Sequence, residues 1–394
     1  MINKIKDLAS NLHEEIRTIR RHIHQNPELS FQEFNTQNYV WQQLEAIGIA
    51  NKQKIANTGI LAIIEGKNPS KKVVALRGDM DALPIIEAND VPYKSNNNGV
   101  MHACGHDVHT SCLLGAAKII NQLKDEFEGT VKLVFQPGEE KLPGGASVMI
   151  KEGVLKNPEV TNIIGQHVMP LLPVGKVGFR KGLYMASTDE IYMTIKGKGG
   201  HGAQPHQNID PIVAMAQVIT ALQQLVSRVA SPIIPSVLSF GKVIANGATN
   251  IIPNEVYLEG TFRTLDEEWR AKAHESIVKI AKGISESFGC QCDIEIRKGY
   301  PFLKNNPELT QTAIDNAINY MGAENVVNLD IWMAAEDFSY YSQELPACFY
   351  RLGTRNDAKN ITSHVHTPTF DIDEDALPIG MGLMAWLAIA ELNG

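Results

Sequence analysis

The order of the elements predicted between residues 183 and 299 sharply limits the folds open to this chain. Residues Asp189–Lys196 alternate apolar and polar side chains, which is typical of a strand buried on one face. A helix is predicted over Asp210–Val226, with Pro211 suited to its first turn. Further elements follow as strands Ser236–Val243 and Glu255–Arg263, helix Glu267–Phe288 and strand Cys290–Arg297. The β-α-β-β-α-β order predicts a ferredoxin-like α+β domain.

On both sides of this segment the chain has α/β character. In the N-terminal part, residues 5–23, 33–47 and 109–124 predict helices, and Gly59–Glu65, Lys72–Leu76 and Gly129–Gln136 predict strands. Such alternation predicts a layered α/β sheet with helices on both faces. Because 394 residues exceed what one core usually holds, we expect two domains. We predict a large catalytic domain with a mixed sheet from residues 1–182 and 300–394, and an inserted domain at 183–299.

Charge and composition exclude several classes of protein. The balance of 36 Lys and Arg against 44 Asp and Glu gives a net charge of −8, without a basic run, so nucleic acid is not expected as a partner. No membrane segment is expected, because the N-terminus lacks the apolar core of a signal peptide and the apolar stretch Leu377–Ala390 is short and contains Pro378. Five cysteines are too few for a disulfide scaffold, so we expect a reduced, cytoplasmic protein.

Cys104 and His106 stand on either side of a glycine in a segment that leads into a predicted helix. A thiolate and an imidazole at this spacing form a plausible half of a zinc site. The alternative is a buried cysteine beside residues that cap the helix. This pair alone does not distinguish the two interpretations.

Glu139 and Glu140 follow the strongly apolar strand that ends at Gln136. Two adjacent carboxylates disfavour joint ionisation unless a cation or a proton compensates them. Neighbouring side chains in an extended segment point in opposite directions, so one can ligate a metal while the other accepts a proton from water. The alternative is an exposed acidic turn, which the preceding apolar run makes less favourable.

Two further histidines extend the constellation. His167 is predicted to end a short apolar strand, and His366 lies in Ser363-His-Val-His near the end of the chain. Each histidine alone is more often structural than a ligand. Ligand sites in open α/β sheets form at the carboxyl ends of strands, where these residues are expected to meet. Their combined donors are enough for two ions, which favours a two-metal hydrolytic site.

The chain resembles the M20 metallopeptidases, in particular their aminoacylase-like amidohydrolase branch, which includes N-acyl-amino-acid, hippurate and indole-acetyl-amino-acid hydrolases. The resemblance covers nearly the whole chain, in family order. The segments that carry it are RRHIHQNPELSFQE (20–33), LRGDMDALPI (76–85), MHACGHDVHT (101–110), FQPGEE (135–140), QHV (166–168), GKGGHGAQPH (197–206), TNIIPNE (249–255), GTFRT (260–264), AEDF (335–338) and HTPTFDIDEDAL (366–377).

The resemblance implies roles for residues of the large domain. Glu139 would be the general base and later the general acid, and Asp81 would orient a group of the active site. Two divalent ions per subunit are implied; zinc suits the donors, and manganese, cobalt and nickel are alternatives. Cys104 would bridge the ions. The implied ligands are Cys104, His106, Glu140, His167 and His366.

The resemblance also implies roles for residues of the inserted domain. His201, on a glycine-rich loop, would reach the active site of a neighbouring subunit, and Asn250 and Arg263 would hold the carboxylate of the substrate. A loop histidine, a turn asparagine and a surface arginine are the alternatives. A homodimer through the inserted domain, which would act as a lid and dimerisation domain, is implied as well.

The implied activity is hydrolysis of an N-acyl amino acid to a carboxylate and a free amino acid by a metal-activated water, with Glu139 as base. A dipeptidase or aminopeptidase is the alternative with the same chemistry. A catalytically silent ligand-binding protein on the same scaffold is the alternative of a different class, and the presence of Glu139 beside Glu140 disfavours it.

Overall fold

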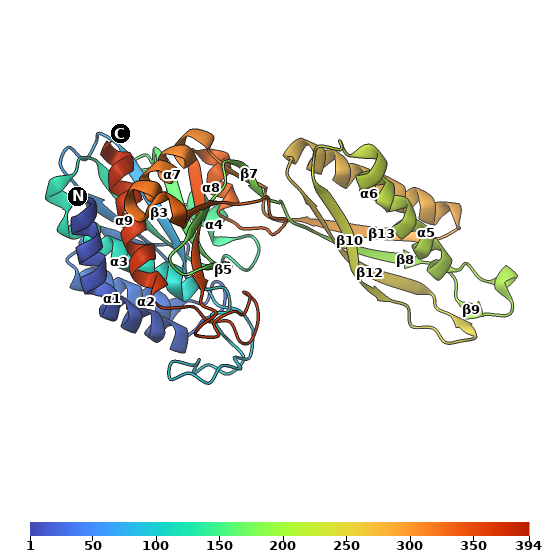
Figure 1. Ribbon diagram of the computed structural model, residues 1–394. Helices are drawn as coiled ribbons and strands as arrows, with labels where there is room; N and C mark the ends of the chain where they lie inside the picture. The colour runs from blue at the N-terminus through green and yellow to red at the C-terminus, as the bar shows by residue number, and fades with distance from the viewer. Residues whose placement is uncertain (394) are drawn as a thin grey trace. The chain divides into compact units, whose positions relative to one another are not determined.

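The structure, a computed structural model, describes residues 1–393 and divides into two compact units. Within the described residues, the first unit comprises 1–184, 304–331 and 337–393, and the second comprises 185–303 and 332–336. Figure 1 shows the helices and strands of each unit. Strands β7 (Gly182–Met185) and β14 (Leu303–Asn305) lie where the chain passes from one unit to the other.

The first unit is built on an eight-stranded mixed sheet with the order β1-β2-β4-β3-β5-β16-β6-β15. Strands β4, β3, β5 and β16 are parallel. The pairs β1–β2, β2–β4 and β16–β6 are antiparallel, and β15 pairs in parallel with β6. Near-continuous burial of β3 and β4 shows that helices cover both faces. The strands are β1 (Lys52–Ile55), β2 (Gly59–Glu65), β3 (Val73–Asp79), β4 (Thr130–Gln136), β5 (Asn162–Pro173), β6 (Val177–Phe179), β15 (Val326–Asn328) and β16 (Ala347–Arg355).

The helices of the first unit form layers on the two faces of this sheet. Helices α2 (Phe34–Ala46), α3 (His106–Gln122), α7 (Pro307–Met321) and α9 (Ala376–Asn393) cover one face, with α1 (Ile2–Gln25) packed on α3 and α9. Helices α4 (Gly145–Lys151) and α8 (Ser339–Glu344) contact each other and lie against β4 and β16 respectively. This arrangement confirms the predicted mixed sheet flanked by helices.

Helix α9 is apolar all round because it lies in the core of the first unit. By length and composition, both α9 and Pro211–Val229 of the second unit would be long enough to cross a membrane. The burial of α9 among α1, α3 and α7 accounts for its composition without a bilayer.

Strand β5 is longer than we predicted. His167 does not end it, since the strand continues to Pro173. Beyond Gly165 the neighbour β3 no longer pairs with β5, and only β16 does. Prolines are tolerated where one side of a strand is unpaired, so Pro170 and Pro173 do not stop it.

The second unit contains a four-stranded antiparallel sheet with the order β10-β12-β8-β13. Helices α5 (Pro211–Gln224) and α6 (Glu267–Ser287) pack on it, and Asp210 and Asp266 cap their N-termini. The chain order is β-α-β-β-α-β, and the sheet order is that of a split β-α-β fold. The strands are β8 (Asp189–Lys196), β10 (Ser236–Ile244), β12 (Glu255–Thr264) and β13 (Gln291–Lys298).

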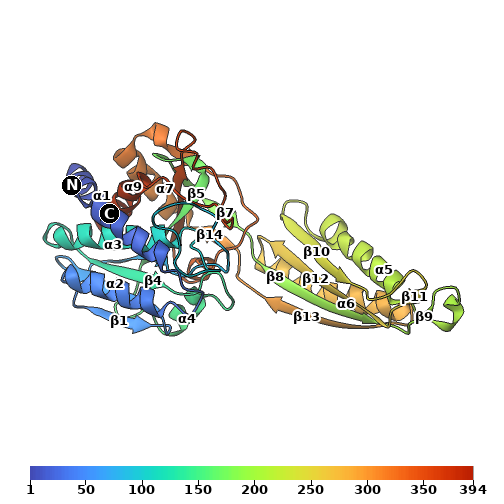
Figure 2. The same ribbon diagram turned by 90° about the horizontal axis from the view of Figure 1, so that it is seen from below.

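Two short strands lie together at one end of the second unit, as Figure 2 shows. Strand β9 (Gly200–His201) pairs with β11 (Ile251–Ile252) in the segments that precede α5 and β12. Helix α5 continues into a π-helical turn over Leu225–Val229, at the point where we predicted the helix to end.

Candidate metal centre

The first unit brings together five side chains that carry metal-ligating atoms. Cys104, His106 and His167 place one such atom each within 4.8 Å of one another. The same limit holds for Cys104, Glu140 and His366. Because Cys104 belongs to both groups, the arrangement offers two adjacent sets of donors that share one sulfur.

Sheet topology explains why these residues meet. Asp79 and Gln136 are register partners at the carboxyl ends of the parallel strands β3 and β4. Glu139 and Glu140 come three and four residues after the end of β4, at the edge where open α/β sheets form their ligand sites. His106 is the first residue of α3, and His167 lies on the parallel strand β5.

The glycine between Cys104 and His106 is required by the backbone. Gly105 has φ +82°, the left-handed region that favours glycine. A Cβ at this position would lie 2.6 Å from Cγ2 of Val168, the residue after His167. Gly105 therefore lets the loop approach β5 closely enough for Cys104 and His167 to face each other, with Sγ and Nε2 3.5 Å apart.

His366 enters the cluster from the distant C-terminal segment with a strained backbone. Its φ of +61° is uncommon for a residue other than glycine, and such strain persists only where the surroundings impose it. The backbone N–H of His366 donates to the carbonyl oxygen of Ala103 at 2.7 Å. This bond fixes the imidazole beside Glu140, with Nε2 3.1 Å from Oε1.

The electrostatics of the cluster suit a cation. Contacts with Cys104 and Glu140 raise the pKa of His366 to about 10. Burial raises the pKa of the Cys104 thiol and lowers that of His167. A divalent ion would compensate the buried thiolate and carboxylate in place of protons.

The donors also fit a metal by their chemistry. The buried Nε2 of His106 has no hydrogen-bond partner within residues 1–393. Buried polar atoms without a partner are rare, and coordination to a metal ion would satisfy this nitrogen. Thiolate, imidazole and carboxylate are the ligands that zinc takes in proteins. These residues therefore fit the implied pair of divalent ions.

Asp81 links three residues of the cluster by hydrogen bonds. It is buried, and its Oδ1 lies 3.1 Å from Nδ1 of His106 and accepts the backbone N–H of Glu139 at 3.0 Å. Its Oδ2 accepts the N–H of Glu140 at 2.9 Å and the hydroxyl of Ser30 at 2.6 Å. Burial opposes ionisation, but the hydrogen bonds, that of His106 first, lower the pKa of Asp81 overall. The carboxylate thus orients His106 and the acidic pair at once.

Glu139 lies beside the ligand set and is nearly buried. One carboxylate oxygen of Glu139 is within 4.8 Å of the donor atoms of His106 and Glu140. Its Oε1 accepts the backbone N–H of Asp337 at 3.3 Å. The acidic turn considered as an alternative is therefore not an exposed one.

A buried ionic network behind the cluster was not predicted from the sequence. Arg77 donates to Asp79 and, at 2.8 Å, to Asp337, and all three side chains are buried. Asp79 accepts from Nδ1 of His109, whose Nε2 accepts the N–H of Val168 at 2.9 Å. His109 thereby supports the strand that carries His167. The sequence signal was the charged Arg77 and Asp79 inside an otherwise apolar strand.

The second unit carries the other three candidate residues, and it separates them. His201 pairs with Ile251 in register, and the N–H of Gly202 donates to the carbonyl oxygen of Asn250 at 2.8 Å. Arg263 lies near the opposite end of β12, eight residues beyond Glu255, which is about 26 Å of strand. Asn250 and His201 are therefore neighbours, and neither lies beside Arg263.

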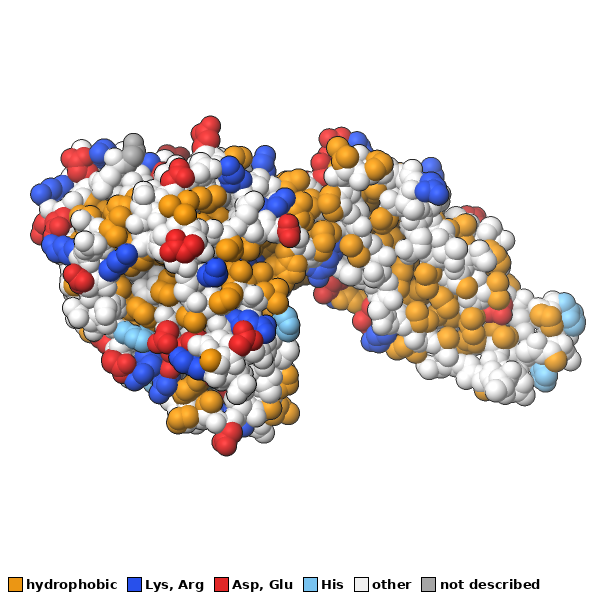
Figure 3. Space-filling view, in the orientation of Figure 1, with side chains coloured by type: hydrophobic (Ala, Val, Ile, Leu, Met, Phe, Trp, Pro, Cys, Tyr) orange, Lys and Arg blue, Asp and Glu red, His pale blue; other side chains and the backbone are white. Residues whose placement is uncertain are grey.

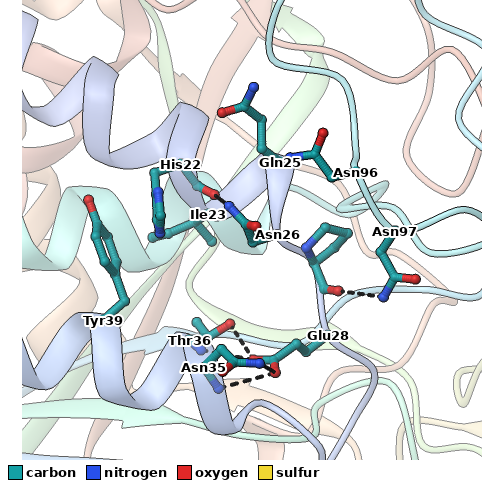
Figure 4. A pocket seen from close by; sticks show the side chains of 11 residues that line it. His22, Ile23, Gln25, Asn26, Glu28, Asn35, Thr36, Tyr39, Asn96 and Asn97 are labelled. Atoms are coloured by element: carbon teal, nitrogen blue, oxygen red, sulfur yellow. Dashed lines mark hydrogen bonds between the residues drawn. The ribbon is translucent and has the colours of Figure 1, made fainter.

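A cavity of about 510 Å³ lies elsewhere in the first unit, where α1 ends and α2 begins (Figure 4). His22 stacks on Tyr39, and the carboxylate of Glu28 is engaged by Asn35 and Thr36. None of the predicted site residues lines this cavity.

The sequence is similar to that of metallopeptidase-family proteins and of named hydrolases. The sequence model of the family described as Peptidase family M20/M25/M40 matches residues 75–390. The chain is 44% identical to an N-acyl-L-amino acid amidohydrolase of Geobacillus stearothermophilus over 75% of this chain and 80% of that protein. It is 38% identical to thermostable carboxypeptidase 2 of Saccharolobus solfataricus over 100% and 99%.

A solved structure shares the fold over almost its whole length. The crystal structure of the Bacillus subtilis YXEP protein, described as a dinuclear metal binding peptidase from the M20 family, has a TM-score of 0.83 and 35% identity. The match covers 98% of this chain and 99% of that one.

Proposed function

The chain belongs to peptidase family M20/M25/M40, and on this basis we propose that it is a metal-dependent amidohydrolase that cleaves N-acyl amino acids. The observation that carries the proposal is Glu139, a carboxylate next to a complete set of metal donors and separate from it. Binding of metal alone does not require such a second carboxylate. The named activity of the Geobacillus relative supports the choice of substrate class.

The residues that would hold two divalent ions are Cys104, His106, Glu140, His167 and His366. When bound, the ions would lower the pKa of water and polarise the carbonyl oxygen of the substrate. Glu139 accepts a proton from the water whose oxygen attacks the amide carbon. It then donates this proton to the amide nitrogen as the C–N bond breaks. The products are a carboxylic acid, which loses its proton to solvent, and a free amine.

Arg263 is proposed to bind the carboxylate of the amino acid. Its guanidinium is half-buried and donates to the carbonyl oxygen of Met333 at 3.2 Å. No Asp or Glu of the described residues forms an ion pair with Arg263. Burial lowers the pKa of its guanidinium. Such a guanidinium is suited to a planar carboxylate through its fork of donors.

His201 and Asn250 are proposed to act at the active site of a second subunit in a homodimer. The separation of this pair from Arg263 along β12 supports the proposal, because one substrate does not span about 26 Å of strand. Strand β10 is an edge of its sheet, and Val237 and Val243 on it are exposed. Hydrophobic side chains also gather on the visible face of the second unit in Figure 3.

A reduced, cytoplasmic setting is part of the proposal. All five cysteines of the chain are free and buried, and Cys104 would need to stay a thiolate to serve as a ligand. Small molecules, rather than nucleic acids or membranes, are the proposed partners, in keeping with the acidic net charge.

A peptidase acting on short peptides is the second candidate. The near full-length similarity to a protein named as a carboxypeptidase supports it, because the same centre hydrolyses peptide bonds. The two candidates differ in the group on the acyl side of the scissile amide, which is a simple acid in one and an amino acid in the other.

Turnover by the metal-reconstituted protein tests the proposal. N-acetyl amino acids, hippurate and dipeptides are compared at equal concentration by measuring the released amine. Preference for the acetyl and benzoyl substrates supports the amidohydrolase, and preference for dipeptides supports the peptidase. Absence of turnover with all three, in a sample that holds bound metal, would contradict both and favour a binding protein.

A further inference from the structure

The connection between α1 and α2 (residues 26–33) is hydrogen-bonded to the loop that carries Glu139 and Glu140, and it is conformationally strained. Phe31, in this connection, has φ +64°. A bulky side chain in the left-handed region is a true outlier, and strain of this kind is concentrated at functional sites. Nothing in the proposed mechanism so far uses this segment.

Glu33 holds the strained residue and the acidic loop with one oxygen atom. Its Oε1 accepts the backbone N–H of Phe31 at 2.9 Å and that of Gly138 at 2.8 Å. Its Oε2 accepts the hydroxyl of Thr58 at 2.6 Å. The side chain is fully buried, and each of these donors is neutral.

Phe31 and Gly138 fit each other sterically. Gly138 has φ +57°, and a Cβ on it would lie 2.5 Å from Cζ of Phe31. The phenyl ring thus occupies the space where any other residue would carry a side chain. The loop after β4 is thus fixed at Gly138 by two contacts: the ring of Phe31 packs against its Cα, and the carboxylate of Glu33 accepts its backbone N–H.

Glu33 and Asp81 together bind three consecutive backbone amides. Glu33 accepts the N–H of Gly138, and Asp81 accepts those of Glu139 and Glu140. The same connection also anchors Asp81, since Ser30 donates to its Oδ2. Two buried carboxylates close to each other disfavour ionisation of both. Burial, and then the charge of Asp81, therefore raise the pKa of Glu33 to about 7.

We propose that Glu33 is a positioning residue. It fixes the backbone of Gly138 against Phe31, and this places Glu139 for proton transfer and Glu140 for metal ligation. The inference rests on the proposed function. Among the described residues, the Glu33 carboxylate accepts hydrogen bonds from Phe31, Thr58 and Gly138 and from none of the proposed ligands, so it acts through the loop backbone. Removing its carboxylate frees one end of the three-residue loop while Asp81 still holds the other.

Three variants separate positioning from a general contribution to folding. Glu33→Ala removes the acceptor of Gly138. Glu33→Gln keeps an amide oxygen for Phe31 and Gly138, and its NH₂ can donate to the hydroxyl of Thr58. Thr58→Val is the matched control, because it removes one hydrogen bond of Glu33 but leaves the bond to Gly138.

Two readouts are measured for each variant: the dissociation constant for Co²⁺, followed by its absorption spectrum, and kcat at saturating metal. Loss of residues that support metal ligands typically costs 10–100-fold in affinity or activity. We expect Glu33→Ala to raise the dissociation constant or lower kcat by about this factor, with KM little changed. Glu33→Gln should stay within about threefold of the wild type in both, as should Thr58→Val.

Wild-type values for both readouts in Glu33→Ala would overturn the inference. Equal losses in Glu33→Ala and Glu33→Gln would also overturn it, since an amide oxygen would then not replace the carboxylate. A wild-type protein that binds Co²⁺ but hydrolyses no substrate would contradict the proposed function instead, and the Co²⁺ affinities would still decide whether Glu33 positions the loop.

Discussion

Replacement of Asp81 by asparagine should weaken both the fold and the metal centre. Asn keeps one oxygen, and the NH₂ group is best placed at the position of Oδ2, where the hydroxyl of Ser30 can accept from it. The N–H of Glu140, which is part-buried, then loses its acceptor, and this costs about 1–3 kcal/mol. The bonds from His106 and Glu139 become bonds to a neutral group and weaken by about 1 kcal/mol each.

The expected sum is a loss of about 3–5 kcal/mol in the free energy of unfolding of the metal-free protein. Metal affinity should fall about 10–100-fold as well, because His106 and Glu140 lose a partner that orients them. Urea unfolding of the metal-free protein measures the first quantity, and titration with Co²⁺ measures the second.

Glu28 provides a matched control. Its carboxylate also accepts four hydrogen bonds, from the backbone and side chains of Asn35 and Thr36, and none from the cluster. Glu28→Gln should lower stability without changing Co²⁺ affinity. Unchanged affinity in Asp81→Asn, or an equal loss of affinity in Glu28→Gln, would refute the role given to Asp81.

Three further predictions concern the reaction and the metal. Glu139→Gln should lower kcat by about 10²–10⁴-fold at unchanged metal content, and loss of metal in elemental analysis would show that base and ligand are wrongly assigned. Because the pKa of His366 is raised to about 10 in the metal-free site, its proton is present at pH 6–8 and must leave when metal binds. Zn²⁺ affinity should therefore rise with pH, by about tenfold per pH unit for each proton displaced. Competition titrations measure this affinity, and a value independent of pH would contradict the prediction. Arg263→Ala should raise KM for substrates with a free carboxylate and leave KM for their amides unchanged.

Much of the fold was predictable because its elements bury one face. Periods of two and of three to four residues identified β8, α5, β10, β12, α6 and β13 in order. Helix α9 has no such period, since it is buried on all sides, and only its apolar composition was evident. The continuation of β5 through Pro170 was missed because its one-sided pairing depends on where β3 ends.

The candidate site was predictable to the extent that its donors follow strands or begin a helix. Cys104 and His106 lie at the start of α3 and Glu140 follows β4, and only their combination with His167 and His366 favoured a metal site. Glu33 and Asp337 contribute through hydrogen bonds to residues more than a hundred positions away in sequence. Such bonds leave no local pattern, so only the folded chain reveals them.

Two ions in this cluster, with Glu139 beside them, are what would make the protein an amidohydrolase. The decisive quantity is the rate of hydrolysis of an N-acetyl amino acid by the metal-free protein as Co²⁺ is added in known ratio to the chain. The rate should be near zero without metal and reach a plateau at two equivalents. Full activity without metal, or none at any ratio for any N-acyl amino acid, would contradict the proposed role of the cluster.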